Sequence, residues 1–129
     1  MTTRDGPIDL LIKSVVGAAF EVSNELGHGF SESLYQRALL SELQLRGIEA
    51  EREVRFHVTY KTQAIGTYIA DLIVGGCLIV ELKSVETLSD THIGEVLNYL
   101  KASNLTAGLL LNFGQPKVSF RRVLRQRSH

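Results

Sequence analysis

Apolar residues recur every three or four positions in three stretches of the chain, which is the spacing of one face of a helix. The first stretch covers residues 8–26 and ends at the helix-breaking sequence Gly27-His28-Gly29. The second covers residues 31–46, and it begins with a serine that can cap it and is followed by a glycine. A third helix is predicted from residue 89 or 90 to about residue 102.

Other segments have the patterns of strands. One alternates between apolar residues, such as Val54 and Phe56, and polar ones. Another is almost wholly apolar, as expected of a central strand that is covered on both faces. The predicted strands cover residues 51–60, 65–74, 78–84 and 106–112, with a polar turn at 61–64, a glycine turn at 75–76, and a short last strand or helical tail at 118–124.

The predicted order is two helices, three strands, a helix and a strand, followed by the short tail. A helix between the third and fourth strands permits a parallel crossover, so parallel and antiparallel pairs are expected in one sheet. The fold class is therefore α/β (α+β), with a mixed central β-sheet flanked by helices. The length of 129 residues suits a single domain over residues 1–129.

Charge and composition narrow the classes of function. The chain has 14 basic and 14 acidic residues, so its formal net charge is zero, which argues against tight DNA binding by charge alone. No apolar run reaches the roughly 18 residues that span a bilayer, and the first residues lack the layout of a signal peptide. We therefore expect a cytoplasmic protein without a membrane partner. The single cysteine, Cys77, cannot form an internal disulfide.

Basic residues gather near the end of the chain. Arg121, Arg122 and Arg125 lie in a stretch that contains no acidic residue. They could contact the phosphates of a nucleic acid. They could equally belong to a solvated terminus, and the sequence leaves both interpretations open.

Two acids and a lysine interrupt the apolar strands in the middle of the chain. Asp71 lies in the second predicted strand. Glu81 and Lys83 lie in the third, where they share one face because side chains alternate along a strand. If the turn between these strands takes the three residues 75–77, Asp71 lies opposite Glu81. The three charged groups then surround a common point.

This arrangement suits a divalent cation. Mg²⁺ prefers oxygen ligands and keeps several waters, so two carboxylates can hold it. A bound metal polarises a phosphoryl oxygen and acidifies a water, and the ammonium group of Lys83 can orient that water or offset charge on the phosphate. A Glu-x-Lys sequence alone is often a surface salt pair. The apolar surroundings favour a functional role, because charged groups are costly there.

At these residues the chain resembles a known family. Asp71, followed by Glu81-Leu82-Lys83 at the end of an apolar strand, resembles the PD-(D/E)XK nuclease superfamily, although Ala70 stands where a proline often precedes the aspartate. Upstream, Gly29-Phe-Ser-Glu32-Ser-Leu-Tyr35 is similar to the signature of the GxxExxY protein family, a bacterial branch of that superfamily. The resemblance extends over residues 8–124.

The resemblance implies a restriction-endonuclease-like αβββαβ core. It also implies a catalytic site of Asp71, Glu81, Lys83 and Glu32, in which the three acids hold Mg²⁺ or Mn²⁺. Glu32 has an alternative role as an acid favoured in the first turn of a helix. Tyr35 lies one turn later, and it either fixes Glu32 by a hydrogen bond or only packs.

The helix after the lysine-bearing strand carries the other accessory candidates. Relatives often have Gln-x-x-x-Tyr there, whereas this chain has Glu95 and Tyr99. An ionised glutamate cannot donate a hydrogen bond, so Glu95 is either a further metal ligand or an obstacle to a phosphate. His92 matches a histidine often found at this position, and it either contacts the substrate or lies on the surface.

Two functions follow. The first is a metal-dependent nuclease that hydrolyses phosphodiester bonds in nucleic acid, with DNA favoured over RNA. The second is a catalytically weak or inactive binding or accessory module that keeps the nuclease fold, which the zero net charge and Glu95 favour. The apolar N-terminal helix could also serve a homodimer.

Overall fold

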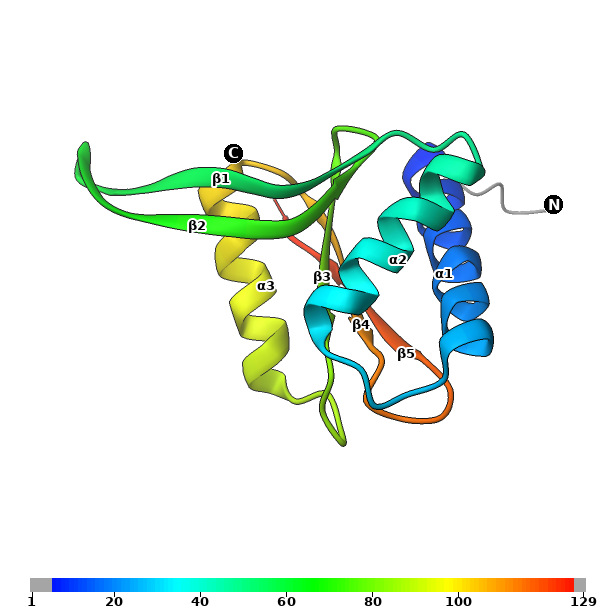
Figure 1. The fold of residues 1–129 in the computed structure, drawn as a ribbon. Helices are drawn as coiled ribbons and strands as arrows, with labels where there is room; N and C mark the ends of the chain where they lie inside the picture. The colour runs from blue at the N-terminus through cyan, green and yellow to red at the C-terminus, as the bar shows by residue number, and fades with distance from the viewer. Residues whose placement is uncertain (1–5, 127–129) are drawn as a thin grey trace, which may run out of the picture.

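The structure is a computed structural model, and it describes residues 6–126 (Figure 1). Three helices and five strands lie in this part of the chain. They are α1 (Pro7–Leu26), α2 (Glu32–Leu45), β1 (Ala50–Tyr60), β2 (Gln63–Val74), β3 (Leu78–Lys83), α3 (Asp90–Ser103), β4 (Ala107–Asn112) and β5 (Ser119–Leu124).

The helices and the first four strands lie close to their predicted positions. Of the two alternatives left open for residues 118–124, the structure has the strand, β5, which pairs with β4. One detail differs from the prediction. The polar turn is shorter than predicted, because Lys61 and Thr62 have positive φ angles of 47° and 69°. Such a two-residue turn matches the twist of paired strands, so Gln63 pairs with Tyr60 and belongs to β2.

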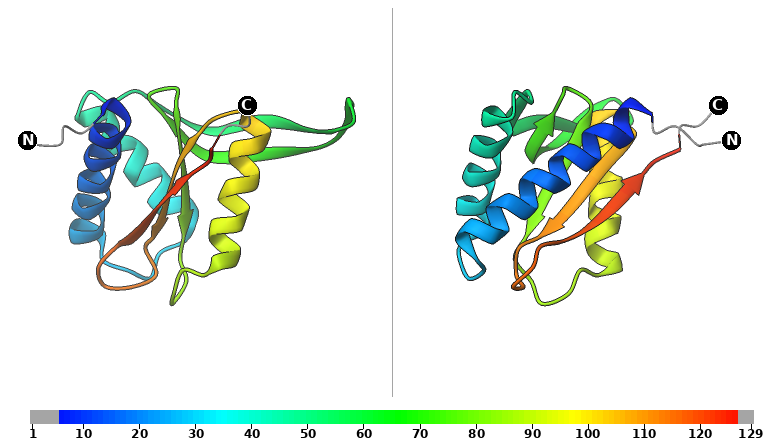
Figure 2. Two further views of the ribbon diagram at one scale, coloured as in Figure 1. Left: turned by 180° about the vertical axis from the view of Figure 1, so that it is seen from behind. Right: turned by 90° about the vertical axis from the view of Figure 1, so that its right-hand side faces the viewer.

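The sheet is mixed, as predicted. Its five strands lie in the order β1-β2-β3-β4-β5, and only β3 and β4 run parallel, because α3 makes the crossover between them. Figure 2 shows α1 and α2 on one side of the sheet and α3 on the other. Each side has its own apolar core, with Val80 and Leu82 of β3 facing α1 and α2, and Ile79 facing α3.

The strand β2 lies beside β3 only at its carboxyl end. It pairs with β1 along most of its length, but with β3 over three residue pairs only, the last of which joins Leu72 to Val80. Beyond that pair the β1–β2 hairpin extends away past α3 (Figure 1). Ala70 packs on the α3 side and Leu72 packs on the α1–α2 side, so the alternation of faces breaks at Asp71.

The loop after β3 is fixed by the loop after β4. The buried Asn112 accepts hydrogen bonds from the backbone nitrogens of Val85 (3.0 Å) and Gly114 (2.9 Å), and it donates to the carbonyl oxygen of Val85 (2.9 Å). These bonds hold the chain that follows Lys83 against the end of the sheet.

None of the helices within residues 6–126 combines the length and the apolar character needed to cross a bilayer.

A glycine substitution tests how tightly this loop is held. A Cβ atom at Gly114 would overlap the backbone of Val85, so Gly114→Ala should lower the free energy of unfolding by at least about 2 kcal/mol. Gly94→Ala is the matched control, because a Cβ atom at that helical position meets no heavy atom within 4 Å. Urea denaturation of both variants should show loss for the first and a gain of about 0.5–1 kcal/mol for the second. Equal stabilities would contradict this account of the loop.

Candidate active site

Asp71 and Glu81 bond to each other across the point where β2 leaves β3. Val74 pairs with Leu78, which leaves the three residues 75–77 for the turn, as the predicted register requires. Beyond the last paired residues of β2 and β3, hydrogen bonds between side chains and backbone take the place of the backbone–backbone bonds. The Asp71 carboxylate accepts from the backbone nitrogen of Leu82 (2.8 Å), and the backbone nitrogen of Asp71 donates to Oε1 of Glu81 (3.4 Å).

The Glu81 carboxyl lies in an apolar and aromatic environment. Only 7% of the residue is exposed, and its Oε1 also accepts a hydrogen bond from the Tyr68 hydroxyl. Tyr68 stacks on Tyr99 of α3, with 3.7 Å between the ring centroids. Burial first, and the charge of Asp71 second, raise the pKa of Glu81 from 4.5 to about 9. At neutral pH this favours the protonated form of Glu81 in the isolated chain.

Lys83 points to α3. Its Nζ forms an ion pair with Oε2 of Glu95 at 3.5 Å, and the Tyr99 hydroxyl donates to the same oxygen at 3.4 Å. Burial, followed by the charge of Glu95, raises the pKa of Tyr99 to about 12. The predicted residues Glu95 and Tyr99 therefore lie on the side of α3 that faces Lys83, and Glu95 is the ion-pair partner of the Lys83 ammonium group.

The donor set has the chemistry of a cation site with two protein ligands. Asp71 and Glu81 are adjacent carboxylates, and no lysine or arginine in the described part of the chain forms an ion pair with either. Two carboxylates with water suit Mg²⁺ or Mn²⁺. Within residues 6–126, however, no three His, Cys, Asp or Glu side chains lie close enough together to hold a metal ion. The three-acid set with Glu32 is therefore not assembled.

Glu32 and Tyr35 do not bond to each other, although the sequence allowed it. The Glu32 carboxylate accepts from the backbone nitrogen of Ser84 at 3.1 Å, next to the end of β3. Tyr35 is fully buried, and its hydroxyl donates to the carbonyl of Gly27 and not to Glu32. Its ring stacks on Phe113 at 4.6 Å. Of the two roles left open for Tyr35, the structure therefore supports packing. Its hydroxyl bonds the loop between α1 and α2 and does not hold Glu32.

Three other candidates have partners inside the chain. His92 belongs to the capping box of α3, where its Nδ1 accepts from the backbone nitrogen of Ser89. Arg125 donates to two carbonyl oxygens at the end of α3, both at 3.2 Å. Arg122 forms an ion pair with Asp9 at 3.1 Å. Arg121 is exposed on β5, an edge strand separated from β3 by β4.

Sequence analysis missed two residues that contact the acids. Gln36 of α2 donates from Nε2 to Oδ1 of Asp71 at 3.2 Å, and Tyr68 bonds Glu81. A signal existed for Gln36, since it lies at helical spacing from Leu39 and Leu43 on the buried face of α2. Tyr68 carried no such signal, because aromatic residues are ordinary in strands.

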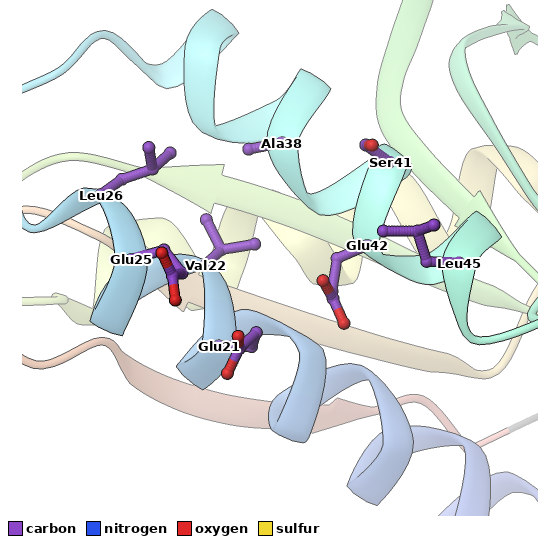
Figure 3. Close-up of a pocket in the computed structure, with 8 residues that line it drawn as sticks. All are labelled: Glu21, Val22, Glu25, Leu26, Ala38, Ser41, Glu42 and Leu45. Atoms are coloured by element: carbon purple, nitrogen blue, oxygen red, sulfur yellow. The ribbon is translucent and has the colours of Figure 1, made fainter.

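A separate pocket of 220 Å³ lies between α1 and α2. Figure 3 shows its apolar floor, to which Val22 and Leu26 contribute, with the carboxylates of Glu21, Glu25 and Glu42 around it. None of the predicted site residues lines this pocket. It is therefore not part of the candidate active site.

The protonated Glu81 predicts a pH dependence of stability. The folded chain keeps this proton up to about pH 9, whereas the unfolded chain loses it near 4.5, so the folded chain binds more protons between these values. Without divalent cations, the free energy of unfolding should fall as the pH rises through this window, by at most about 1.4 kcal/mol per unit. Glu81→Gln should remove that contribution. Urea denaturation of the wild type and of Glu81→Gln from pH 5 to 9 measures this contribution. If both free energies of unfolding changed equally with pH, Glu81 would not hold the proton.

Comparisons with known proteins identify the family of this chain. The family model described as PD-(D/E)XK nuclease superfamily matches residues 9–123. The crystal structure of SSO0001 superimposes with a TM-score of 0.54 and 13% identity, over 92% of this chain and 79% of that one, which bears on the fold alone. No curated protein matches. The matched span holds Asp71, Glu81 and Lys83, and the chain belongs to the PD-(D/E)XK nuclease superfamily.

Proposed function

We propose that this protein is a metal-dependent nuclease that hydrolyses phosphodiester bonds in nucleic acid, and that it belongs to the GxxExxY branch of the superfamily. The observation that carries the proposal is the contact between Asp71 and Glu81 at the fork of β2 and β3, with Lys83 one step along the same strand face. Membership of a nuclease superfamily supports it.

In the proposed site, Asp71 and Glu81 hold Mg²⁺ or Mn²⁺. When bound, the cation polarises a phosphoryl oxygen and acidifies a water. Asp71 keeps its orientation through the hydrogen bonds to both of its oxygens. Glu81 would have to be ionised to hold the cation, and burial and the charge of Asp71, which raise its pKa, oppose that ionisation.

Lys83 is the proposed group that meets the scissile phosphate or its attacking water. Its ion pair with Glu95 has to open or be shared when the substrate binds. Glu32, the first residue of α2, accepts a hydrogen bond from the backbone nitrogen of Ser84 and thereby holds the segment directly after Lys83. Tyr99 keeps Glu95 in place through its hydroxyl.

We further propose that the substrate is DNA rather than RNA and that the protein acts in the cytoplasm. We also propose a homodimer, since cutting both strands of a duplex needs two sites. The exposed Arg121 is the remaining candidate among the three arginines for a phosphate contact away from the site.

Neutralising Asp71 tests the site. Asp71→Asn keeps the shape of the side chain but removes a charged ligand, so nucleic-acid cleavage with Mn²⁺ should fall by at least about 100-fold, the upper end of what loss of a ligand's supporting group costs. Mn²⁺ should also cease to raise the melting temperature, because it no longer binds the native state. Glu86→Gln, on the exposed loop after β3, is the matched control and should retain both properties. Cleavage that survives Asp71→Asn would exclude this site as its source.

A catalytically weak accessory module is the second candidate function. One observation favours it: Glu95 forms an ion pair with Lys83 and places a negative charge beside the position proposed for the phosphate. The formal net charge of zero also gives no general attraction to nucleic acid. In this case the chain would bind its partner through the same face and cleave it slowly.

Glu95→Gln tests whether Glu95 holds back cleavage at this site. The neutral amide releases Lys83 from its ion pair and removes a charge that repels phosphate, so a nuclease held back by Glu95 should cleave several-fold to about tenfold faster, or ~1.4 kcal/mol in the barrier. The initial rate with Mn²⁺ measures this, with the exposed Glu86→Gln again as control. A large loss of rate would instead show that the Glu95 carboxylate takes part in the reaction.

A further inference from the structure

Gln36 is a polar residue on the apolar face of α2. The residue is 6% exposed, and Leu39 and Leu43 on the same face are fully buried. A buried amide costs free energy unless both of its ends are bonded, and an apolar side chain of similar size would fill the same space. The presence of an amide at this position therefore needs a polar explanation.

Both ends of the Gln36 amide are hydrogen-bonded, one to an acceptor and the other to a donor. Nε2 donates to Oδ1 of Asp71 at 3.2 Å, while Oε1 accepts from Nη1 of Arg52 at 2.9 Å. A carboxylate only accepts and a guanidinium only donates, so the amide has a single orientation that makes both bonds. Arg52 thereby fixes which end of Gln36 faces the acid.

Arg52 is itself fixed at the base of the β1–β2 hairpin. Its Nη1 also forms an ion pair with Glu53 at 3.0 Å, and its side chain is 26% exposed. Glu53 lies between the residues that pair with Ala70 and Leu72, so its register position is opposite Asp71. Its φ of 55° interrupts the β1–β2 ladder there. The chain of bonds thus joins β1, α2 and β2 at the residue where β2 bends.

We propose that Gln36 is a positioning residue for the divalent cation, and that Arg52 acts through it. The inference rests on the proposed function. Gln36 holds Oδ1 of Asp71 and the backbone of Leu82 holds Oδ2, so the carboxylate cannot rotate. Each carboxylate oxygen accepts more than one bond, which leaves room for a cation on the side of Glu81. Groups that fix a metal ligand in this way typically change metal affinity by about 10- to 100-fold.

Gln36→Met tests the proposal by Mn²⁺ affinity, measured by calorimetry without substrate. Methionine keeps the length of the side chain and the helix propensity but loses both bonds. The dissociation constant for Mn²⁺ should rise by about 10- to 100-fold. Gln44→Met, the same change at an exposed position of α2, should leave it unchanged.

The outcomes separate this inference from the proposed function. A wild-type protein that binds no Mn²⁺ overturns both. Wild-type binding that Gln36→Met leaves unchanged overturns the role of Gln36 alone. If Gln36→Met does not fold, Arg52→Met replaces it, because Arg52 is partly exposed on an edge strand. It should weaken Mn²⁺ binding by several-fold, since the amide then loses the donor that sets its orientation, and an unchanged affinity would again exclude the relay.

Discussion

The structure of the site depends on two hydrogen bonds that join Asp71 to Glu81 and Leu82 where β2 leaves β3. A strand that separates from its neighbour exposes backbone groups that need new partners. Here the Asp71 carboxylate accepts the backbone N–H of Leu82, and the Glu81 carboxylate accepts that of Asp71. The same two side chains therefore end the β2–β3 ladder and present two acids to one point, so the fork in the sheet and the site form together.

This solution is costly for stability, which argues that it serves a function. Glu81 is nearly buried and keeps a proton beside Asp71, and the partners Gln36 and Tyr68 are polar groups in otherwise apolar surroundings. Well-packed apolar residues at such positions are often as stable or more so. The chain instead satisfies every buried side-chain polar atom in its described residues, at the price of four polar residues around one point.

The sequence predicts the fold well because its signals are local. Helical spacing and strand alternation locate the elements, and the glycines at 75 and 76, with φ of 61° and 69°, fix a three-residue turn and hence the register of Asp71 and Glu81. Contacts between distant elements carry no such signal. The bond from Gln36 to Asp71 spans 35 residues, and it depends on how α2 is rotated over the sheet. The same holds for the hydroxyl of Tyr35, which the sequence leaves equally able to reach Glu32.

The contacts around the two acids also determine what has to change when the site is loaded. Lys83 is paired with Glu95, and Glu81 keeps a proton, so these two groups are already neutralised before any ligand binds. In the proposed function, a phosphate would compete with Glu95 for the ammonium group, and a cation would compete with a proton for Glu81. Neither exchange requires Asp71 to move, because both of its oxygens are bonded to α2 and β3. Asp71 is thus the fixed point of the site, and the groups on either side of it are the ones that exchange partners.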